Sequence, residues 1–228
     1  GLNFLFEVTL GRPEAMAKRH ALGLRSAREN IADLIDAGSF SEYGALAVAA
    51  QSKRRNADDL MRNTPGDGMV CGTATVGGTP CVVMAYDYTV LAGTQGAGNH
   101  QKTGRMRSLA IKLKLPVVLF AEGGGGRPGD VDANVVAGLH VATFASFARL
   151  SGQVSVVGIV AGQAAPAGLG GQDHHVGRQA AQEVRQRGLQ RVQGALHVDV
   201  DHLVHVLGTE REERPGARDA GVRHHDVD

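Results

Sequence analysis

The sequence predicts an α/β domain in which helices cover a sheet, and three observations support this. Residues 69–76 and 79–86 are rich in Val, Thr and Cys and flank a Gly-Gly pair, as the two strands of a hairpin do. Residues 116–121 form a short apolar run, which is typical of a strand buried on both faces. A helical pattern at 134–149 then leads to a second such run at 154–160. Strand, helix and strand in this order indicate a sheet covered by helices.

A short amphipathic helix is predicted before the hairpin. Ser26 and Glu29 have the spacing of a capping box, with Ser at the N-cap and Glu at N3. The apolar residues within 31–35 then recur at helical spacing. Gly38 stands where a C′ glycine would end the helix.

The hairpin determines how the two cysteines of the chain are related. A two-residue loop places Val76 opposite Thr79 and Ala74 opposite Cys81. Because side chains alternate between the faces of a strand, Cys71 then lies on the other face of the ribbon. The sequence therefore predicts two free thiols, which suit a reducing cytosol.

Two glycine-rich segments flank a predicted helix in the centre of the chain. The first, Gly93–Gly98, is expected to be a loop. Residues 105–113 follow as a helix with apolar residues on one side. The second glycine-rich segment, 122–130, comes directly after the apolar run at 116–121.

Four consecutive glycines at 123–126 are the most informative feature of the sequence. Such glycines are kept where the backbone approaches another group closely or adopts a positive φ. At a strand-to-helix junction, their N–H groups can point into a cleft and stabilise an oxyanion. A flexible surface loop is the alternative that implies no function. We interpret Glu122, which precedes the glycines, as ordering this loop rather than as an acid–base group.

A dinucleotide site is a further alternative, because Gly124, Gly126 and Gly129 satisfy the G-x-G-x-x-G spacing after a strand. That interpretation requires an Asp or Glu about 20 residues beyond the motif. The sequence has no acidic residue between positions 133 and 172, and Pro128 lies inside the motif. The glycine spacing alone is therefore a weak signal for NAD.

Several separated motifs, in order, resemble the carboxyltransferase subunits of acyl-CoA carboxylases. They are Arg25–Ile31, Asp36–Gly44, Asp67–Val70 with its hairpin, Ala92–Gly96, Asn99-His100 with Lys102, Leu119–Asp130 and Val156–Gly162. The resemblance covers about residues 13–162 and implies a crotonase-like α/β fold. It implies an N-terminal, CoA-binding carboxyltransferase domain at 1–162. We expect this domain to be incomplete, because the sequence departs from the family pattern after Gly162 and a second, biotin-facing domain is absent.

The resemblance also implies a reaction, the transfer of a carboxyl group from carboxybiotin to the α-carbon of a short acyl-CoA. Carboxybiotin releases carbon dioxide, the biotin ureido nitrogen takes the α-proton, and the thioester enolate attacks the carbon dioxide. The protein holds the reactants close and stabilises oxyanions. The implied partners are the acyl-CoA, a biotinylated carrier, a biotin carboxylase subunit and further copies of the chain. We expect a cytoplasmic location, or the mitochondrial matrix in a eukaryote, and no activity from this chain alone.

Two other functions stay open at this point. The chain can be a fragment that binds CoA or another nucleotide without turning it over. It can also be an enoyl-CoA hydratase or isomerase of the same fold, which would need a Glu or Asp general base beside the thioester.

The resemblance assigns roles to individual residues. Gly124 and Gly125 match the glycine pair that supplies oxyanion N–H groups, and Gly126 follows them. The residues implied in substrate binding are Gln95, Gly96, Asn99, His100, Lys102 and Arg127.

The basic residues among and near these positions have alternative interpretations. Lys102, Arg105 and Arg107 can meet CoA phosphates near a helix N-terminus, and a solvated basic face is the alternative. Arg127 can pair with substrate or a dimer partner, and a structural salt bridge to a carboxylate is the alternative. For His100, a hydrogen-bonded structural role is preferred over that of a general base.

Residues 163–228 form an atypical tail, because the composition changes near residue 160. From there on the sequence contains no Lys, Asn, Ser, Ile, Met, Cys, Phe, Tyr or Trp. A core without these residues has few large side chains to interdigitate. We therefore interpret the tail as out-of-frame or disordered. Histidines such as His174, His175 and His202 stand beside Asp residues there, but no HExxH pattern or cysteine accompanies them, and we predict no metal site.

Bulk properties of the 228-residue chain exclude little else. The formal net charge of +1 gives no argument for a nucleic acid or an anionic membrane as a partner. No apolar stretch approaches the ~20 residues of a membrane span. Because the chain begins with Gly1 rather than Met, we expect a fragment or a processed product.

Overall fold

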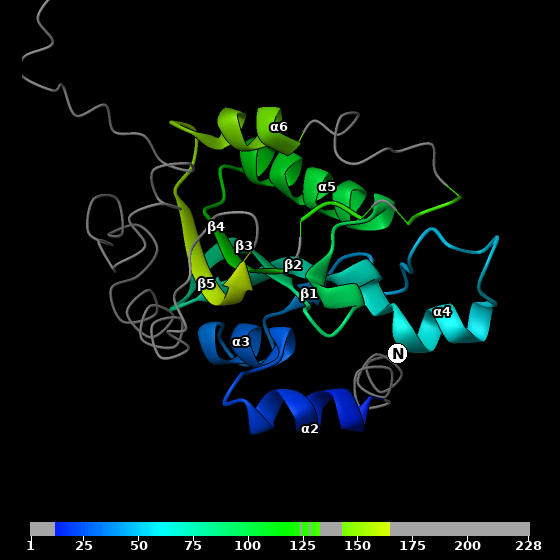
Figure 1. Cartoon of the computed structure of the whole chain (residues 1–228). Helices are drawn as coiled ribbons and strands as arrows, with labels where there is room; N and C mark the ends of the chain where they lie inside the picture. Colours follow the sequence, from blue (N-terminus) through cyan, green and yellow to red (C-terminus); the bar gives the residue numbers. More distant parts are fainter. Residues whose placement is uncertain (1–11, 124, 128, 133–142, 165–228) are drawn as a thin grey trace, which may run out of the picture.

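A computed structural model describes residues 12–123, 125–127, 129–132 and 143–164 of the chain. A five-stranded sheet in the order β1-β2-β3-β4-β5 forms its centre, with helices on both faces (Figure 1). The strands are β1 (Ser41–Glu42), β2 (Met69–Val76), β3 (Thr79–Tyr86), β4 (Val117–Gly123) and β5 (Val156–Ala164). The helices are α2 (Pro13–Ala21), α3 (Ala27–Leu34), α4 (Ala57–Asn63), α5 (Ala97–Leu113) and α6 (Thr143–Leu150). The predicted α/β class is confirmed.

The sheet combines antiparallel and parallel pairing. β2 and β3 form an antiparallel hairpin in which Val76 is opposite Thr79 and Ala74 is opposite Cys81, as predicted. β3, β4 and β5 are parallel, with α5 and α6 in the two crossovers. Because parallel strands end at the same edge, the carboxyl ends of β3, β4 and β5 lie together.

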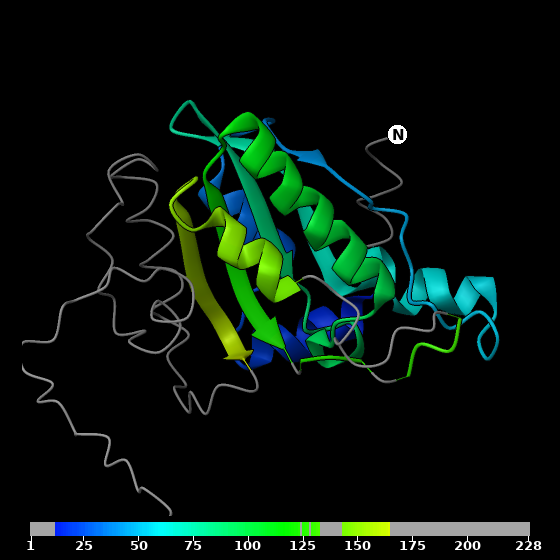
Figure 2. The same ribbon diagram turned by 90° about the horizontal axis from the view of Figure 1, so that it is seen from above.

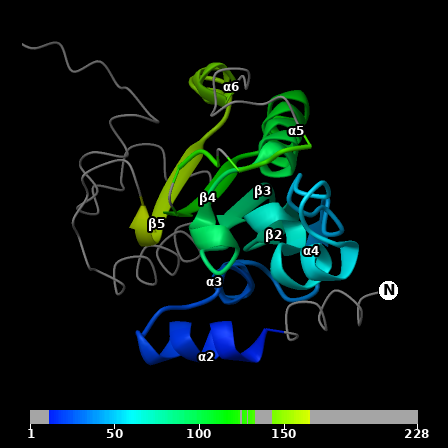
Figure 3. The same ribbon diagram turned by 45° about the vertical axis from the view of Figure 1, so that its right-hand side comes forward.

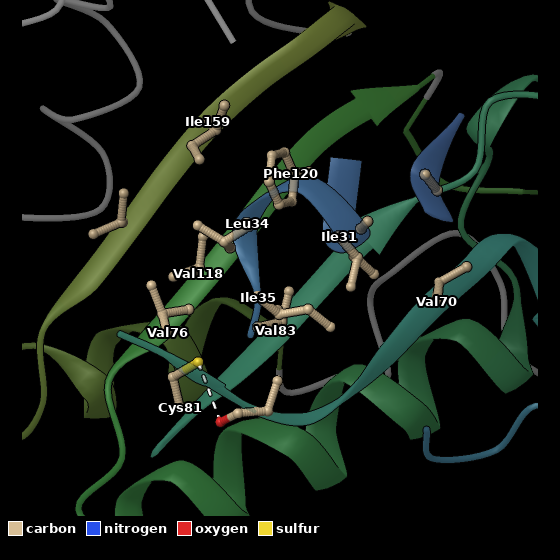
Figure 4. Close-up of a cluster of buried hydrophobic side chains, with 14 residues drawn as sticks. Ile31, Leu34, Ile35, Val70, Val76, Cys81, Val83, Val118, Phe120 and Ile159 are labelled. Atoms are coloured by element: carbon tan, nitrogen blue, oxygen red, sulfur yellow. Dashed lines mark hydrogen bonds between the residues drawn. The ribbon is translucent and has the colours of Figure 1, made fainter. Parts of the chain in front are cut away.

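Period-2 alternation along the strands divides the core into two layers. One layer packs between the sheet and α3 and is drawn in Figure 4, where Ile31, Leu34, Val83 and Phe120 converge. The other packs under α5 and α6, which lie side by side over the sheet in Figure 2. Figure 3 shows these two helices and the pair α2 and α3 on opposite sides of the strands.

Cys71 and Cys81 are free and buried in opposite layers, as the hairpin predicts. Burial raises the pKa of Cys71 to about 11 and that of Cys81 to about 12. Both side chains therefore remain protonated thiols at neutral pH and act as packing groups.

The capping box at the start of α3 is confirmed, but the expected end of the helix is wrong. Ser26 Oγ accepts from the Glu29 amide, and the Glu29 carboxylate accepts from the Ser26 amide at 2.7 Å. The helix ends at Leu34, and Ile35 is already extended with ψ 162°. Gly38, with φ +75°, belongs to the following turn, because the chain leaves α3 to reach β1.

Other boundaries also differ from the prediction. α5 begins at Ala97, eight residues before the expected 105, within the segment predicted as a loop. Leu113, one of the apolar residues expected on one side of this helix, is 54 % exposed. β5 continues past Gly162 to Ala164. The part of the predicted helix at 134–142 and the tail from 165 lie outside the described residues.

The described residues contain no helix long and apolar enough to cross a membrane.

Candidate functional site

The glycine run leaves β4 at the carboxyl edge of the parallel strands and passes beside the entry to α5. Gln95 forms a bridge with Gly126: the Gln95 amide donates to the Gly125 carbonyl at 2.7 Å, and the Arg127 amide donates to the Gln95 carbonyl at 2.9 Å. In a planar trans peptide, C=O and N–H point in opposite directions. Since the Gly125 carbonyl points toward Gln95, the Gly126 N–H points away from it.

Arg127 fixes this bridge from its other end. Its guanidinium forms a salt bridge of 2.5 Å with Asp67 and a longer contact of 3.3 Å with Asp130. Its remaining nitrogens donate to the carbonyl and hydroxyl of Thr94, at 2.6 and 3.1 Å. Arg127, Asp67 and Asp130 are all buried. We call these three side chains the anchor cluster.

The anchor cluster also caps α5. The Ala97 amide, first in the helix, donates to Asp130 at 2.9 Å, and the Asn99 amide, third in the helix, donates to Asp67 at 2.8 Å. Carboxylates at a helix N-terminus satisfy amides that lack partners and complement the helix dipole. These caps allow α5 to begin at Ala97. The sequence did not predict this start, because both capping carboxylates are distant in sequence.

Gly96, the N-cap residue of α5, is required by this packing. A Cβ atom there would overlap the guanidinium of Arg127 and the carboxylate of Asp130. The side chains of the anchor cluster therefore occupy the space beside Gly96, and the predicted substrate contact at this position would have to come from its backbone.

Comparisons with known proteins identify the family of this chain. The carboxyl transferase domain matches residues 18–173. The chain belongs to this family. It is 34 % identical over 159 residues to the propionyl-CoA carboxylase beta chain of Saccharopolyspora erythraea, covering 69 % of this chain and 28 % of that protein.

Solved structures of carboxyltransferases share the fold, which is crotonase-like. A single-chain, multi-domain long-chain acyl-CoA carboxylase matches with TM-score 0.64 and 55 % identity over 70 % of this chain and 17 % of that one. The transcarboxylase 12S core, bound to methylmalonyl-CoA and methylmalonic acid, matches with TM-score 0.58 and 26 % identity over 70 % and 31 %. The chain thus spans less than a third of the length of these relatives.

Within the carboxyl transferase domain, the predicted site residues fall into two groups. Gln95, Gly96 and Asn99 lie at the start of α5, where Gln95 forms the bridge with Gly126 and the Asn99 amide donates to Asp67. Gly124 lies outside the described residues, so its oxyanion role stays a prediction. His100 is half-buried one turn into α5, and burial and then the nearby Arg107 lower its pKa, which favours the neutral imidazole at pH 7.

Lys102 and Arg127 are turned toward the protein interior. The Lys102 ammonium is buried and donates to the carbonyls of Gly66 at 3.0 Å and Met69 at 2.5 Å. Its desolvation lowers the pKa of Lys102. Of the two interpretations given for Arg127, the salt bridge matches its observed partners. Substrate contacts of either residue stay predictions.

Glu122 is buried at the carboxyl end of β4 and pairs with Arg19 of α2. Burial raises the pKa of Glu122, and the hydrogen bond and charge of Arg19 oppose that rise. Arg19 also donates to the carbonyl of Arg25 at 2.5 Å. This pair ties α2 to the strand that leads into the glycine run, in line with the ordering role expected for Glu122.

Sequence reasoning assigned no role to Asp67, Asp130 or Arg19. Their partners are remote in sequence, so only local hints exist. Asp67 lies in a Pro-Gly-Asp-Gly turn and has φ +51°, a value that non-glycine residues rarely adopt and that marks a position held by its surroundings.

Arg107 is a buried cation whose charge is only partly balanced by neighbouring groups. It is 1 % exposed, its Nε and Nη1 atoms have no hydrogen-bond partner, and it pairs with no carboxylate of the described residues. Its guanidinium lies 4.4 Å from the centre of the Phe147 ring of α6. A cation–π contact of ~0.5–2 kcal/mol does not offset the several kcal/mol that desolvating a charge costs.

We expect Arg107→Met to raise the free energy of unfolding by about 1–4 kcal/mol, because an unbranched apolar chain fills this space without a buried charge. Urea denaturation followed by circular dichroism measures the change. Arg105→Met, at an exposed position of the same helix, is the control and should stay within about 0.5 kcal/mol of wild type. A less stable Arg107→Met protein would contradict the view that this buried charge is a net cost to the fold.

Proposed function

We propose that this domain binds an acyl-CoA and stabilises its enolate within a biotin-dependent carboxyltransferase. The observation that carries this proposal is the bridge between Gln95 and Gly126 at the carboxyl edge of the parallel strands, which aims the Gly126 N–H away from Gln95. Ligands of α/β sheets bind at this edge. A fixed N–H donor there suits an oxygen that gains negative charge during the reaction.

The residues of the chain would act by binding and orientation. Carboxylated biotin, when presented by a partner, supplies the carboxyl group and takes up the α-proton of the acyl-CoA. Gly126, with Gly124 and Gly125, would donate to the thioester oxygen as it becomes an enolate oxygen. No described residue is assigned to biotin. The biotinylated carrier, the biotin carboxylase subunit, self-association and the cytoplasmic location stay predictions.

The buried carboxylates do not suit the hydratase alternative. Asp67, Glu122 and Asp130 are the buried acidic residues of the described chain, and each forms a salt bridge with an arginine. A general base must be able to accept a proton from substrate or water. These three carboxylates are instead held by cations, so the carboxyltransferase proposal is preferred.

Calorimetry on the 228-residue chain tests the binding half of the proposal. Propionyl-CoA and CoA are expected to bind, and NAD is the comparison ligand. Binding of NAD without binding of CoA would favour the dinucleotide interpretation of the glycine spacing and contradict the proposal.

A chimera tests the catalytic half. Residues 13–162 replace the matching segment of the Saccharopolyspora propionyl-CoA carboxylase beta chain, and incorporation of labelled bicarbonate into propionyl-CoA is measured with the biotin carboxylase partner and ATP. We expect transfer that depends on the biotinylated carrier. A folded chimera that binds acyl-CoA but transfers no carboxyl group, or one that hydrates an enoyl-CoA instead, would count against the proposal.

A further inference from the structure

We propose that Asp67 is a positioning residue that sets the direction of the Gly126 N–H. This inference rests on the proposed function, because it assigns Asp67 a part in stabilising the enolate. Asp67 does not belong to the glycine run; it lies before β2, in the short helical turn η1 (Pro65–Gly68).

The contacts of Asp67 join three segments at one carboxylate. One oxygen accepts from Arg127 at 2.5 Å, and the other accepts from the Asn99 amide at 2.8 Å. The Asn99 side-chain amide donates back to the Asp67 carbonyl at 3.4 Å. Both oxygens of the carboxylate are therefore engaged, one with Arg127, which follows the glycine run, and one with α5.

Asp67 restrains Gly126 through the neighbouring residue Arg127. Arg127 follows Gly126 directly, and its amide and guanidinium are held by Gln95 and Asp67 respectively. A shift of the guanidinium would turn the Arg127 peptide and loosen the bridge that orients the Gly126 N–H. A misplacement of ~1 Å is enough to lower a rate by roughly 10²-fold when a catalytic donor must meet a charge that develops in the transition state.

The local backbone shows that Asp67 is held for this geometry. Its φ of +51° lies in the left-handed region, which among residues with a side chain Asp and Asn adopt most readily. Its solvent exposure is 0 %, and a Cβ atom on neighbouring Gly98 would lie only 2.9 Å from its Oδ2 atom. The surrounding packing thus holds Asp67 in this conformation, with its carboxylate facing Arg127.

Asp67→Asn is the test variant, because Asn tolerates a positive φ and keeps the shape while removing the charge. Asp36→Asn is the matched control. Asp36 also accepts from backbone amides, those of Gly77 at 3.0 Å and Gly78 at 2.8 Å, but at the opposite end of the hairpin. In the chimera, Asp67→Asn is expected to lower kcat by roughly 10²-fold with much less change in KM, and Asp36→Asn to leave both unchanged.

Infrared spectroscopy measures the stretching frequency of the bound thioester carbonyl, which a loss of stability alone does not change. Propionyl-CoA labelled with ¹³C at the thioester carbonyl is bound to the 228-residue chain in the absence of carboxybiotin. A hydrogen bond from the glycine run lowers the carbonyl stretching frequency. We expect this lowering in wild type and Asp36→Asn, and its loss in Asp67→Asn.

Amide hydrogen exchange on the free chain separates this inference from the proposed function. Asp67→Asn should speed exchange at Arg127 by about 10-fold or more, and Asp36→Asn should not. If Asp67→Asn does not fold, Thr94→Val replaces it, since that change removes the hydroxyl that accepts from Arg127 Nε at 3.1 Å.

The outcomes are distinct. Wild type that binds no acyl-CoA overturns the proposed function, and exchange at Arg127 still decides whether Asp67 orders the loop. Wild type that binds and reacts, with carbonyl frequency and kcat unchanged in Asp67→Asn, overturns the positioning role alone.

Discussion

In the chimeric carboxyltransferase, Gly125→Ala is expected to lower kcat by about 10²–10³-fold, with a smaller rise of KM. Gly125 has φ +79°, and a Cβ atom there would meet no atom within 4 Å. The alanine methyl therefore fits, and the change acts through backbone strain alone. As the loop relaxes toward negative φ, the peptide planes on both sides of residue 125 turn, and the N–H groups of Gly125 and Gly126 lose their direction.

Gly104→Ala is the matched control for this experiment. A Cβ at Gly104 also meets no atom within 4 Å, but this residue lies inside α5 and has no positive φ. The substitution should raise the free energy of unfolding by about 0.5–1 kcal/mol and leave kcat unchanged. Small, equal changes of kcat and KM in Gly125→Ala would indicate a glycine loop that serves only the fold.

Arg19→Met is expected to lower the free energy of unfolding by about 3–5 kcal/mol at neutral pH. The change leaves the Glu122 side chain buried without its partner, with side-chain exposures in the native pair of only 4 % and 2 %. Thermal and urea denaturation measure the loss. Arg25→Met is the control, because its salt bridge with Asp33 is about one-third exposed and such pairs contribute roughly 0–1 kcal/mol.

The loss of stability in Arg19→Met should depend on pH. A carboxyl group whose pKa is raised on folding contributes stability below its unfolded pKa, and that contribution is lost as pH rises through the folded pKa. Burial raises the pKa of Glu122, and removal of Arg19 raises it further. The gap in Tm between wild type and Arg19→Met should therefore be largest near pH 7.5 and narrow near pH 5. Adding Glu122→Gln should abolish this pH dependence, and a gap of constant size would argue against an ionised Glu122.

The elements that the sequence predicted correctly are those whose signals are local. The capping box of α3, the register of the hairpin and the buried strand β4 each depend on residues close together in the chain. The motif order likewise identified the family, because each motif is short and contiguous. The end of α3 was predicted wrongly from Gly38, because a glycine with positive φ occurs within turns as well as after helices.

The arrangement of the site was less predictable, because it depends on long-range ion pairs. Nothing local indicates that Lys102 turns inward to two carbonyls, or that α5 starts at Ala97 under a carboxylate from residue 130. Exposed lysine is the common case, so a basic face was a reasonable expectation. The inward direction follows only once η1 and β2 are in place beside α5.

The anchor cluster also bears on the order in which the chain folds. Asp67 and Arg127 are 60 residues apart, and Ala97 and Asp130 are 33 apart, whereas the strands of the hairpin are joined by two residues. Closing a long loop loses more chain entropy than closing a short one, and non-local contacts form late. The hairpin can therefore pair early, but the glycine run acquires its orientation only after β4 has docked beside β3. A partly folded chain would therefore have a sheet without an ordered glycine run, and any ligand that contacts this run would select the completed fold.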